Sequence, residues 1–87
     1  MPGNDLVQSL VKAADILQLV SRSEKGMRLQ DISEELEIKT STTHNLVRTL
    51  CARNMMCKSS DGRFGVGDAI FEMADRHRER RLLRKAA

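Results

Sequence analysis

The stretch from Leu29 to Leu50 constrains the fold of this 87-residue chain more than any other. It holds two short helical patterns on either side of a tight turn, and the charge reverses between them. Residues 30–37 carry four acidic side chains and no basic one, whereas residues 38–60 carry four basic side chains and no acidic one. The first element repels phosphate and the second can face it. This arrangement is typical of a DNA-reading helix-turn-helix.

The same charge asymmetry divides the whole chain. Residues 1–37 contain 4 Lys and Arg against 7 Asp and Glu, a net charge of −3, whereas residues 38–87 contain 11 against 5, a net charge of +6. We therefore expect the second half to attract an anionic partner. A single domain of this length buries only about 60 to 65% of its unfolded surface, so assembly with a second copy would help its stability.

Several classes of protein are disfavoured by the composition. The two cysteines, Cys51 and Cys57, match no disulfide framework and no paired CxxC zinc pattern, which suits a reducing compartment. The apolar run near the N-terminus is interrupted by Lys12, Asp15 and Gln18, so it predicts neither a signal peptide nor a membrane span. We expect a cytoplasmic protein with no membrane contact, no metal site and no cofactor.

Apolar residues at three- and four-residue steps predict a first helix from about Ser9 to Arg22, with Ser9 as its N-cap. Its expected inward stripe consists of Leu6, Val7, Leu10, Val11, Ala14, Leu17 and Val20. A second helix is predicted over about residues 30–36, and a third from about Thr40 to Arg53, where Asn54 is a suitable left-handed terminator. The turn between them spans residues 37–39, with Ile38 as its apolar plug.

After the third helix, Asp61-Gly62 lies between two short runs, residues 55–59 and 63–66, which is a strong signal for a two-residue hairpin. A hairpin in this place is a wing. Asp68 is a suitable cap for a fourth helix, whose expected apolar side is formed by Ile70, Phe71, Met73 and Ala74. The sequence thus predicts a mostly α fold with a small β-hairpin: a winged helix-turn-helix with a three-helix core, a two-stranded wing and a C-terminal linker helix.

Helical geometry predicts which side chains of the third helix can reach a partner. Thr43, Leu46, Val47 and Leu50 fall on one side and should face the core. The opposite side carries the residues predicted to read DNA bases, which are Asn45, Arg48, Ser41 and, at one edge, His44. Amide and guanidinium groups can pair bidentately with adenine and guanine in the major groove. The residues predicted to contact the DNA backbone are Lys39, Thr40, Thr42, Thr49 and Arg63.

Other interpretations of these patterns remain open. Thr40 and Ser41 are also ordinary capping residues, and a basic segment such as residues 76–85 is most often a solvated helix. An enzyme is disfavoured because His44, Cys51, Cys57 and His77 match no familiar catalytic or zinc spacing. A winged helix can also serve as a protein-interaction module, although a polar third helix argues against it. Single-stranded nucleic acid is disfavoured because tyrosine, tryptophan and paired phenylalanines are lacking for stacking.

The segments that carry a family resemblance are Ser9-Leu10, Ala13-Ala14, Ile16-Leu17, Leu29 to Leu36, Ser41-Thr42, His44, Leu46, Thr49-Leu50, Gly62-Arg63-Phe64 and Gly67. With them, the chain resembles the N-terminal winged helix-turn-helix domain of the IclR family of bacterial transcriptional regulators, over about residues 9–74. The resemblance implies a DNA-contacting role for Ser41, Thr42 and His44. The family usually has glycine where Glu37 stands, which suggests a more constrained or differently shaped turn, and often arginine where Asn45 stands.

The resemblance also implies partners beyond DNA. Family members typically continue into a larger C-terminal domain that binds a small-molecule effector and helps to form dimers. We therefore expect residues 1–74 to be the DNA-binding domain and residues 75–87 to be a basic helical linker toward such a domain. The full-length protein would be an effector-controlled homodimer on a palindromic operator, and we expect it to act as a repressor. Candidate dimer surfaces are the first helix and the fourth helix with its extension at Leu82 and Leu83.

Overall fold

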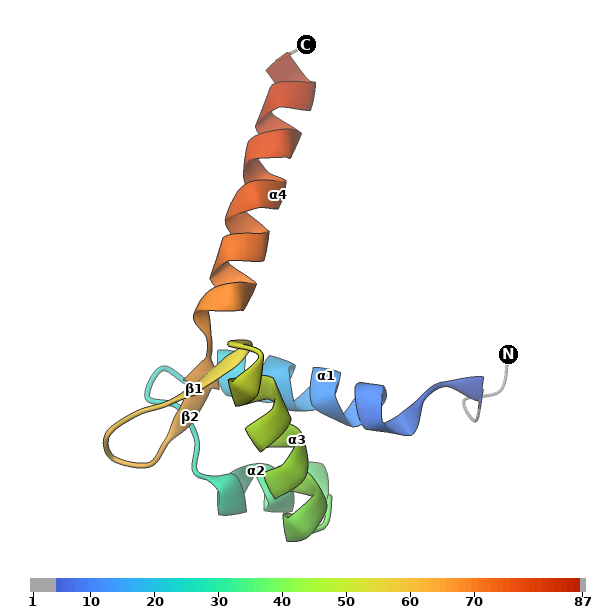
Figure 1. The fold of residues 1–87 in the computed structure, drawn as a ribbon, viewed down its shortest axis with the longest axis vertical. Helices are drawn as coiled ribbons and strands as arrows, with labels where there is room; N and C mark the ends of the chain where they lie inside the picture. The colour runs from blue at the N-terminus through green and yellow to red at the C-terminus, as the bar shows by residue number, and fades with distance from the viewer. Residues whose placement is uncertain (1–4, 87) are drawn as a thin grey trace.

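The computed structural model describes residues 5–86, and the side chains of residues 5–81. Along the chain it contains α1 (Gln8–Ser21), α2 (Leu29–Leu36), α3 (Thr40–Ala52), β1 (Met56–Lys58), β2 (Phe64–Val66) and α4 (Asp68–Ala86). Helices α1 to α3 form the body, the two strands form a hairpin beside it, and α4 projects from the body (Figure 1). The predicted winged helix-turn-helix is confirmed.

The core is aliphatic and draws on every element of the body. Its side chains are Ile16 and Val20 from α1, Ile32 from α2, Val47 and Leu50 from α3 and Met56 from β1, none of them more than 9% exposed. Each fully buried side chain of this kind contributes about 1.5 to 3 kcal/mol relative to an exposed one. The helix-turn-helix is therefore fixed in place by α1 on one side and by the base of the hairpin on another.

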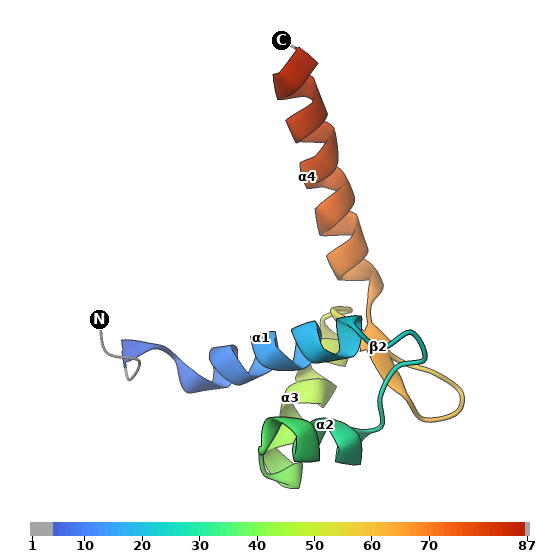
Figure 2. The ribbon, with the colours of Figure 1, turned by 180° about the vertical axis from the view of Figure 1, so that it is seen from behind.

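Helix α1 has nearly the predicted bounds but not the predicted cap or contact face. The carbonyl of Val7 accepts hydrogen bonds from the amides of Leu10 and Val11, both at 3.1 Å, so the helix begins before Ser9 and has no side-chain cap. The predicted stripe is wrong in its first half, because Leu6, Val7 and Leu10 are 56 to 68% exposed. It is also wrong at Ala14, which is exposed, and it left out the fully buried Ile16. The other helices pack only against the C-terminal half of α1 (Figure 2), where Ile16 is fully buried.

The hairpin lies where it was predicted, but its turn is different. Strands β1 and β2 pair antiparallel with Met56 opposite Val66 and Lys58 opposite Phe64. The Ser59 amide still donates to the Arg63 carbonyl at 2.8 Å, and Gly62 has a φ of 86°. The connection is therefore a three-residue loop with a left-handed glycine rather than a two-residue Asp-Gly turn. Met27, in the segment before α2, bridges to Phe64 on the other edge of β2.

Helix α4 leaves the body from a tightly packed base. The amides of Gly67 and Ala69 donate to the carbonyls of Met55 and Asn54, both at 2.9 Å, and a side chain on Gly67 would collide with the Asn54 backbone. Asp68 lies in the first turn of the helix, so it follows the cap position instead of occupying it.

Most of the predicted apolar side of α4 is not covered. Ile70 is half-buried, but Phe71 is 58% exposed, Met73 is 42% exposed, and every described side chain from residue 71 to residue 81 is exposed. The helix runs without a break through the boundary predicted between residues 74 and 75, which stays a prediction. Leu82 and Leu83 lie outside the described side chains. Within the described part of the chain, no helix combines the length and the apolar character needed to cross a membrane.

Candidate nucleic-acid interface

The turn between α2 and α3 is held by a buried serine. Ser33 is 6% exposed, its hydroxyl donates to the carbonyl of Ile38, and its own carbonyl accepts the Ile38 amide at 3.1 Å. The Ser33 hydroxyl oxygen also lies 3.4 Å from that of Thr40, the first residue of α3. These contacts tie the start of α3 to the middle of α2, while Ile38 itself is half-buried.

Glu37 occupies the most strained backbone position of this turn. Its φ of 54° and ψ of 45° place it in the left-handed region, which costs a residue with a side chain about 1 to 2 kcal/mol. Glycine adopts this conformation without that cost. This strain agrees with the more constrained turn expected from the departure from glycine, whereas the alternative expectation, a differently shaped turn, stays a prediction.

The inner side of α3 is buried as predicted. Thr43 is fully buried, and its hydroxyl donates to the carbonyl of Lys39 at 3.0 Å, so its polar group is satisfied within the first turn. Val47 and Leu50 belong to the core, and Leu46 is half-buried against it. This packing fixes the rotation of α3 about its axis and so decides which residues face solvent.

The outer side of α3 brings together the four residues predicted to read bases. Ser41, His44, Asn45 and Arg48 are all exposed. Thr49 is exposed too, but its hydroxyl donates to the carbonyl of Asn45 at 2.8 Å, which leaves that hydroxyl oxygen as an acceptor. The outer side thus offers amide, imidazole, hydroxyl and guanidinium groups, and no carboxylate, to whatever approaches it.

The N-terminus of α3 keeps backbone donors available. Lys39 precedes the helix, and no side chain caps its first amides. The first amides of a helix have no partner within the helix, and they favour anions because the helix dipole adds to them. Lys39 and Thr40 are exposed here, while Thr42 is half-buried. This end of the helix has the donor groups that a backbone phosphate requires.

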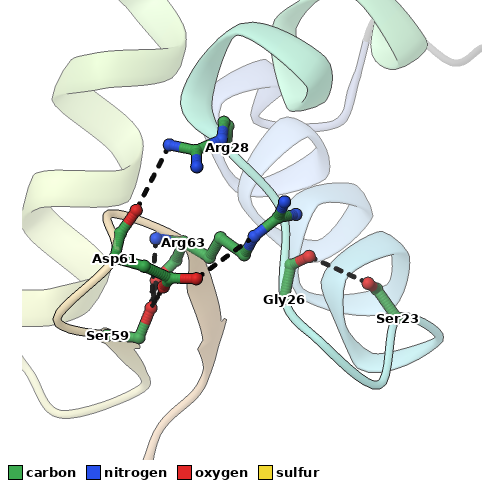
Figure 3. A network of polar contacts seen from close by, with 6 residues as sticks. All are labelled: Ser23, Gly26, Arg28, Ser59, Asp61 and Arg63. Carbon is green, nitrogen blue, oxygen red and sulfur yellow. Dashed lines mark hydrogen bonds and ion pairs between the residues drawn. The ribbon is translucent and has the colours of Figure 1, made fainter.

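Arg63 is separate from α3, on the wing. Its Nε lies 3.4 Å from Oδ2 of Asp61, and its side chain is 34% exposed. The Ser59 hydroxyl donates to Oδ1 of Asp61 and accepts the Arg63 amide at 3.1 Å (Figure 3). The hydrogen bond from Ser59, followed by those from the backbone and by the charge of Arg63, lowers the pKa of Asp61 below its ordinary value of 3.8. Asp61 therefore carries a full negative charge at neutral pH.

Two residues that position these elements were not singled out by the sequence. Arg28 occupies the N-cap of α2, and its Nη1 donates to the carbonyl of Asp61, in the turn of the wing, at 3.2 Å (Figure 3). No local pattern reveals this contact, because the two residues are 33 positions apart. Ser33 gives a weak signal, since it is a small polar residue between Ile32 and Leu36 on the inner side of α2.

The two cysteines are free thiols and, among the described residues, do not form part of a metal site. Cys51 is half-buried and Cys57 is exposed, and both are free. Burial, with a smaller contribution from the neighbouring Cys57, raises the pKa of the Cys51 thiol above 9.0. Among the residues that the structure describes, no group of three His, Cys, Asp or Glu side chains is placed to hold a metal ion.

The hairpin, the buried turn and the polar outer side of α3 define a winged helix-turn-helix. The model of the IclR helix-turn-helix domain matches residues 9–55, which is more than half of the chain. The chain therefore belongs to the IclR family, and its fold is the winged helix-turn-helix DNA-binding domain of these transcriptional regulators. No curated protein matches the sequence.

Solved structures of IclR-family regulators share the fold. The chain superposes on an IclR transcriptional regulator from Alicyclobacillus acidocaldarius with a TM-score of 0.77 and 26% identity, over 83% of this chain and 30% of that one. The repressor BlcR of Agobacterium tumefaciens superposes with a TM-score of 0.72 and 24% identity, over 83% of this chain and 29% of that one. An IclR family transcriptional regulator from Brucella abortus superposes with a TM-score of 0.80 and 16% identity, over 100% of this chain and 34% of that one. The chain thus spans about a third of the length of these structures.

Proposed function

We propose that this chain binds double-stranded DNA in a sequence-specific manner, as the reading head of a bacterial transcriptional regulator. One observation carries the proposal: the core covers one side of α3, and the opposite, exposed side carries Ser41, His44, Asn45 and Arg48 without any acidic group. Such a side matches the donors and acceptors at base edges in the major groove, where Asn pairs with adenine and Arg with guanine. It also has no charge that repels phosphate.

Contacts to the DNA backbone would set the position of α3 in the groove. Lys39, Thr40 and Thr42 surround the uncapped N-terminus of α3, Thr49 lies farther along the helix, and Arg63 extends from the wing. Phosphate contacts of this kind fix register without reading sequence, whereas base contacts select it. The wing would therefore strengthen binding to every duplex, and Asn45 and Arg48 would discriminate among them.

A homodimer of the full-length protein would place two copies of α3 in successive major grooves, about 34 Å apart, on a palindromic operator. Residues 1–74 would form the reading head, and residues 75–87 would lead as a basic helical linker to a C-terminal domain. A small-molecule effector bound by that domain would change the spacing of the two heads. Repression is the mode we propose, in a cytoplasmic protein. This function proceeds by binding, without a catalytic residue or a cofactor.

Selection of bound sequences from a random duplex pool at near-physiological salt tests the proposal. An enriched palindrome with half-sites about one helical turn apart is expected for a dimer, and a single enriched half-site for a monomeric fragment. Recovery of unenriched DNA by a folded protein contradicts sequence-specific reading. That result favours the alternative function, a winged helix that contacts another protein through α3.

A further inference from the structure

The wing contains the one ion pair found among the described side chains, and it involves the arginine that would contact DNA. Oδ2 of Asp61 lies 3.4 Å from Nε of Arg63. Three residues fix Asp61 in this position. Ser59 donates to its other carboxylate oxygen, and Arg28 donates to its peptide carbonyl (Figure 3). Gly62 follows it in a left-handed conformation.

The pair adds little to the stability of the hairpin. Both partners are accessible to solvent, with 34% and 61% of their side-chain surfaces exposed, and exposed pairs contribute little because water and salt screen them. The turn is already closed by backbone hydrogen bonds from Ser59 to Arg63 and from Gly62 to Ser59. If the wing contacts DNA phosphate as proposed, the negative charge beside Arg63 has a cost for binding, whereas its pairing with Arg63 contributes little to folding.

We propose that Asp61 restrains Arg63 and thereby lowers the affinity of the wing for DNA phosphate. The carboxylate and a phosphate oxygen compete for the same guanidinium group. Either Arg63 leaves Asp61 when the wing meets DNA, or the phosphate must approach next to a carboxylate that repels it. In both cases, Asp61 weakens binding to every duplex equally, because a phosphate contact carries no sequence information. This inference rests on the proposed DNA binding.

The matched test is Asp61→Asn, which keeps an oxygen to accept the Ser59 hydrogen bond and removes the charge. Affinity for operator and random duplexes should rise by the same factor, roughly threefold to tenfold at about 0.1 M salt, and the gain should shrink as salt is added. The slope of log affinity against log salt should steepen by about 0.9. Asp15→Asn, an equal change of charge on the exposed side of α1, should change affinity less than twofold.

A second variant tests whether the effect passes through Arg63. In an Arg63→Gln background, Asp61→Asn should raise affinity less than twofold, because the restrained group is gone. An equal gain in both backgrounds would assign the effect to the general field of the protein and overturn the restraint. An unchanged or weaker affinity of the single variant would overturn it as well.

A measurement without DNA separates this inference from the proposed function. The Nε–H resonance of Arg63 in the free protein should shift in Asp61→Asn and stay unchanged in Asp15→Asn. If the wild-type protein binds no duplex even at low salt, the proposed function fails, and this spectrum alone decides whether Asp61 holds Arg63. An unshifted resonance would overturn the restraint whatever the DNA data show.

Discussion

Helices α3 and α4 are both rich in polar residues, but the rest of the body covers one side of α3, whereas α4 is exposed to solvent beyond its first turn. In α3 every third or fourth residue, Thr43, Val47 and Leu50, is buried. In α4 every described side chain from Phe71 to Arg81 is exposed. Packing therefore holds α3 in a single orientation, whereas α4 beyond its first turn relies on local helix propensity, which is marginal for an isolated helix. Only α3 presents its outer side chains in a fixed geometry.

The largest expected difference concerns apolar truncation in the two helices. Leu50→Ala removes core packing at the C-terminal end of α3 and should lower the free energy of unfolding by about 2 to 5 kcal/mol. Met73→Ala on α4 should change it by less than about 0.5 kcal/mol, because its surroundings are solvent. Urea denaturation followed by circular dichroism measures both. A comparable loss for Met73→Ala would mean that α4 is packed in solution.

A matched pair of glycine variants tests the junction between the two helices. Gly67→Ala places a methyl group against the Asn54 backbone, so it should destabilise the fold by about 1 to 3 kcal/mol. Gly65→Ala adds the same group in open space within β2 and should be neutral or slightly stabilising. Thermal denaturation of the two variants provides the comparison. Equal melting temperatures would contradict the tight base of α4.

Two arginine variants compare the helices as DNA-binding elements. Arg48→Ala on α3 should cost about 1 to 3 kcal/mol on the selected operator and relax preference at one base pair. Arg78→Ala on α4 should cost less than about 0.5 kcal/mol, because α4 projects from the body away from α2 and the N-terminus of α3 (Figures 1 and 2). Titration of a labelled duplex measures both. Equal losses of Arg48→Ala on operator and random DNA would refute its role in reading sequence.

Lys39→Ala complements this comparison at the start of α3. It should weaken binding to all duplexes alike and reduce the salt slope by about one, as expected for a phosphate contact. The same titrations, repeated over a range of salt, give the slope. A loss confined to the operator would instead make Lys39 a residue that reads bases.

The smallest expected effect concerns the turn that orients α3. Glu37→Gly relieves the left-handed strain but gives the unfolded chain more freedom, so the net stabilisation should be about 0.5 to 1 kcal/mol. Glu37→Ala keeps the strain and should not stabilise. The urea midpoints of the two variants distinguish these cases. A destabilised glycine variant would show that the Glu37 side chain itself supports the turn.

The elements that the sequence predicted well are those with a local signal. The bounds of α2 and α3 follow from apolar spacing, and the inward side of α3 follows from helical geometry, since Thr43 and Val47 are buried as expected. The hairpin follows from Asp61-Gly62. Its turn was wrong because Gly62 supplies the left-handed residue of a longer loop, which the dipeptide alone does not distinguish.

The features that the sequence could not predict depend on distant partners. The first half of α1 has the same apolar spacing as the second, but only the second meets α2 and α3, so Leu10 is 68% exposed while Ile16 is fully buried. The contact of Arg28 with Asp61 likewise requires the folded wing. Of the predicted site, the outer position of Ser41, His44, Asn45 and Arg48 follows from periodicity, whereas the pairing of Arg63 with Asp61 was not foreseen.

The close-packed base of α4 couples the direction of this helix to the residues at the end of α3. At 1.5 Å per residue its 19 residues span about 28 Å, so a tilt of about 10° at the base displaces the far end by about 5 Å. The two amides donated to Met55 and Asn54, with the close fit of Gly67, connect that base directly to the C-terminal end of α3. A change in the direction of α4 at this base would therefore act directly on the residues that follow α3, the helix that we propose to read DNA.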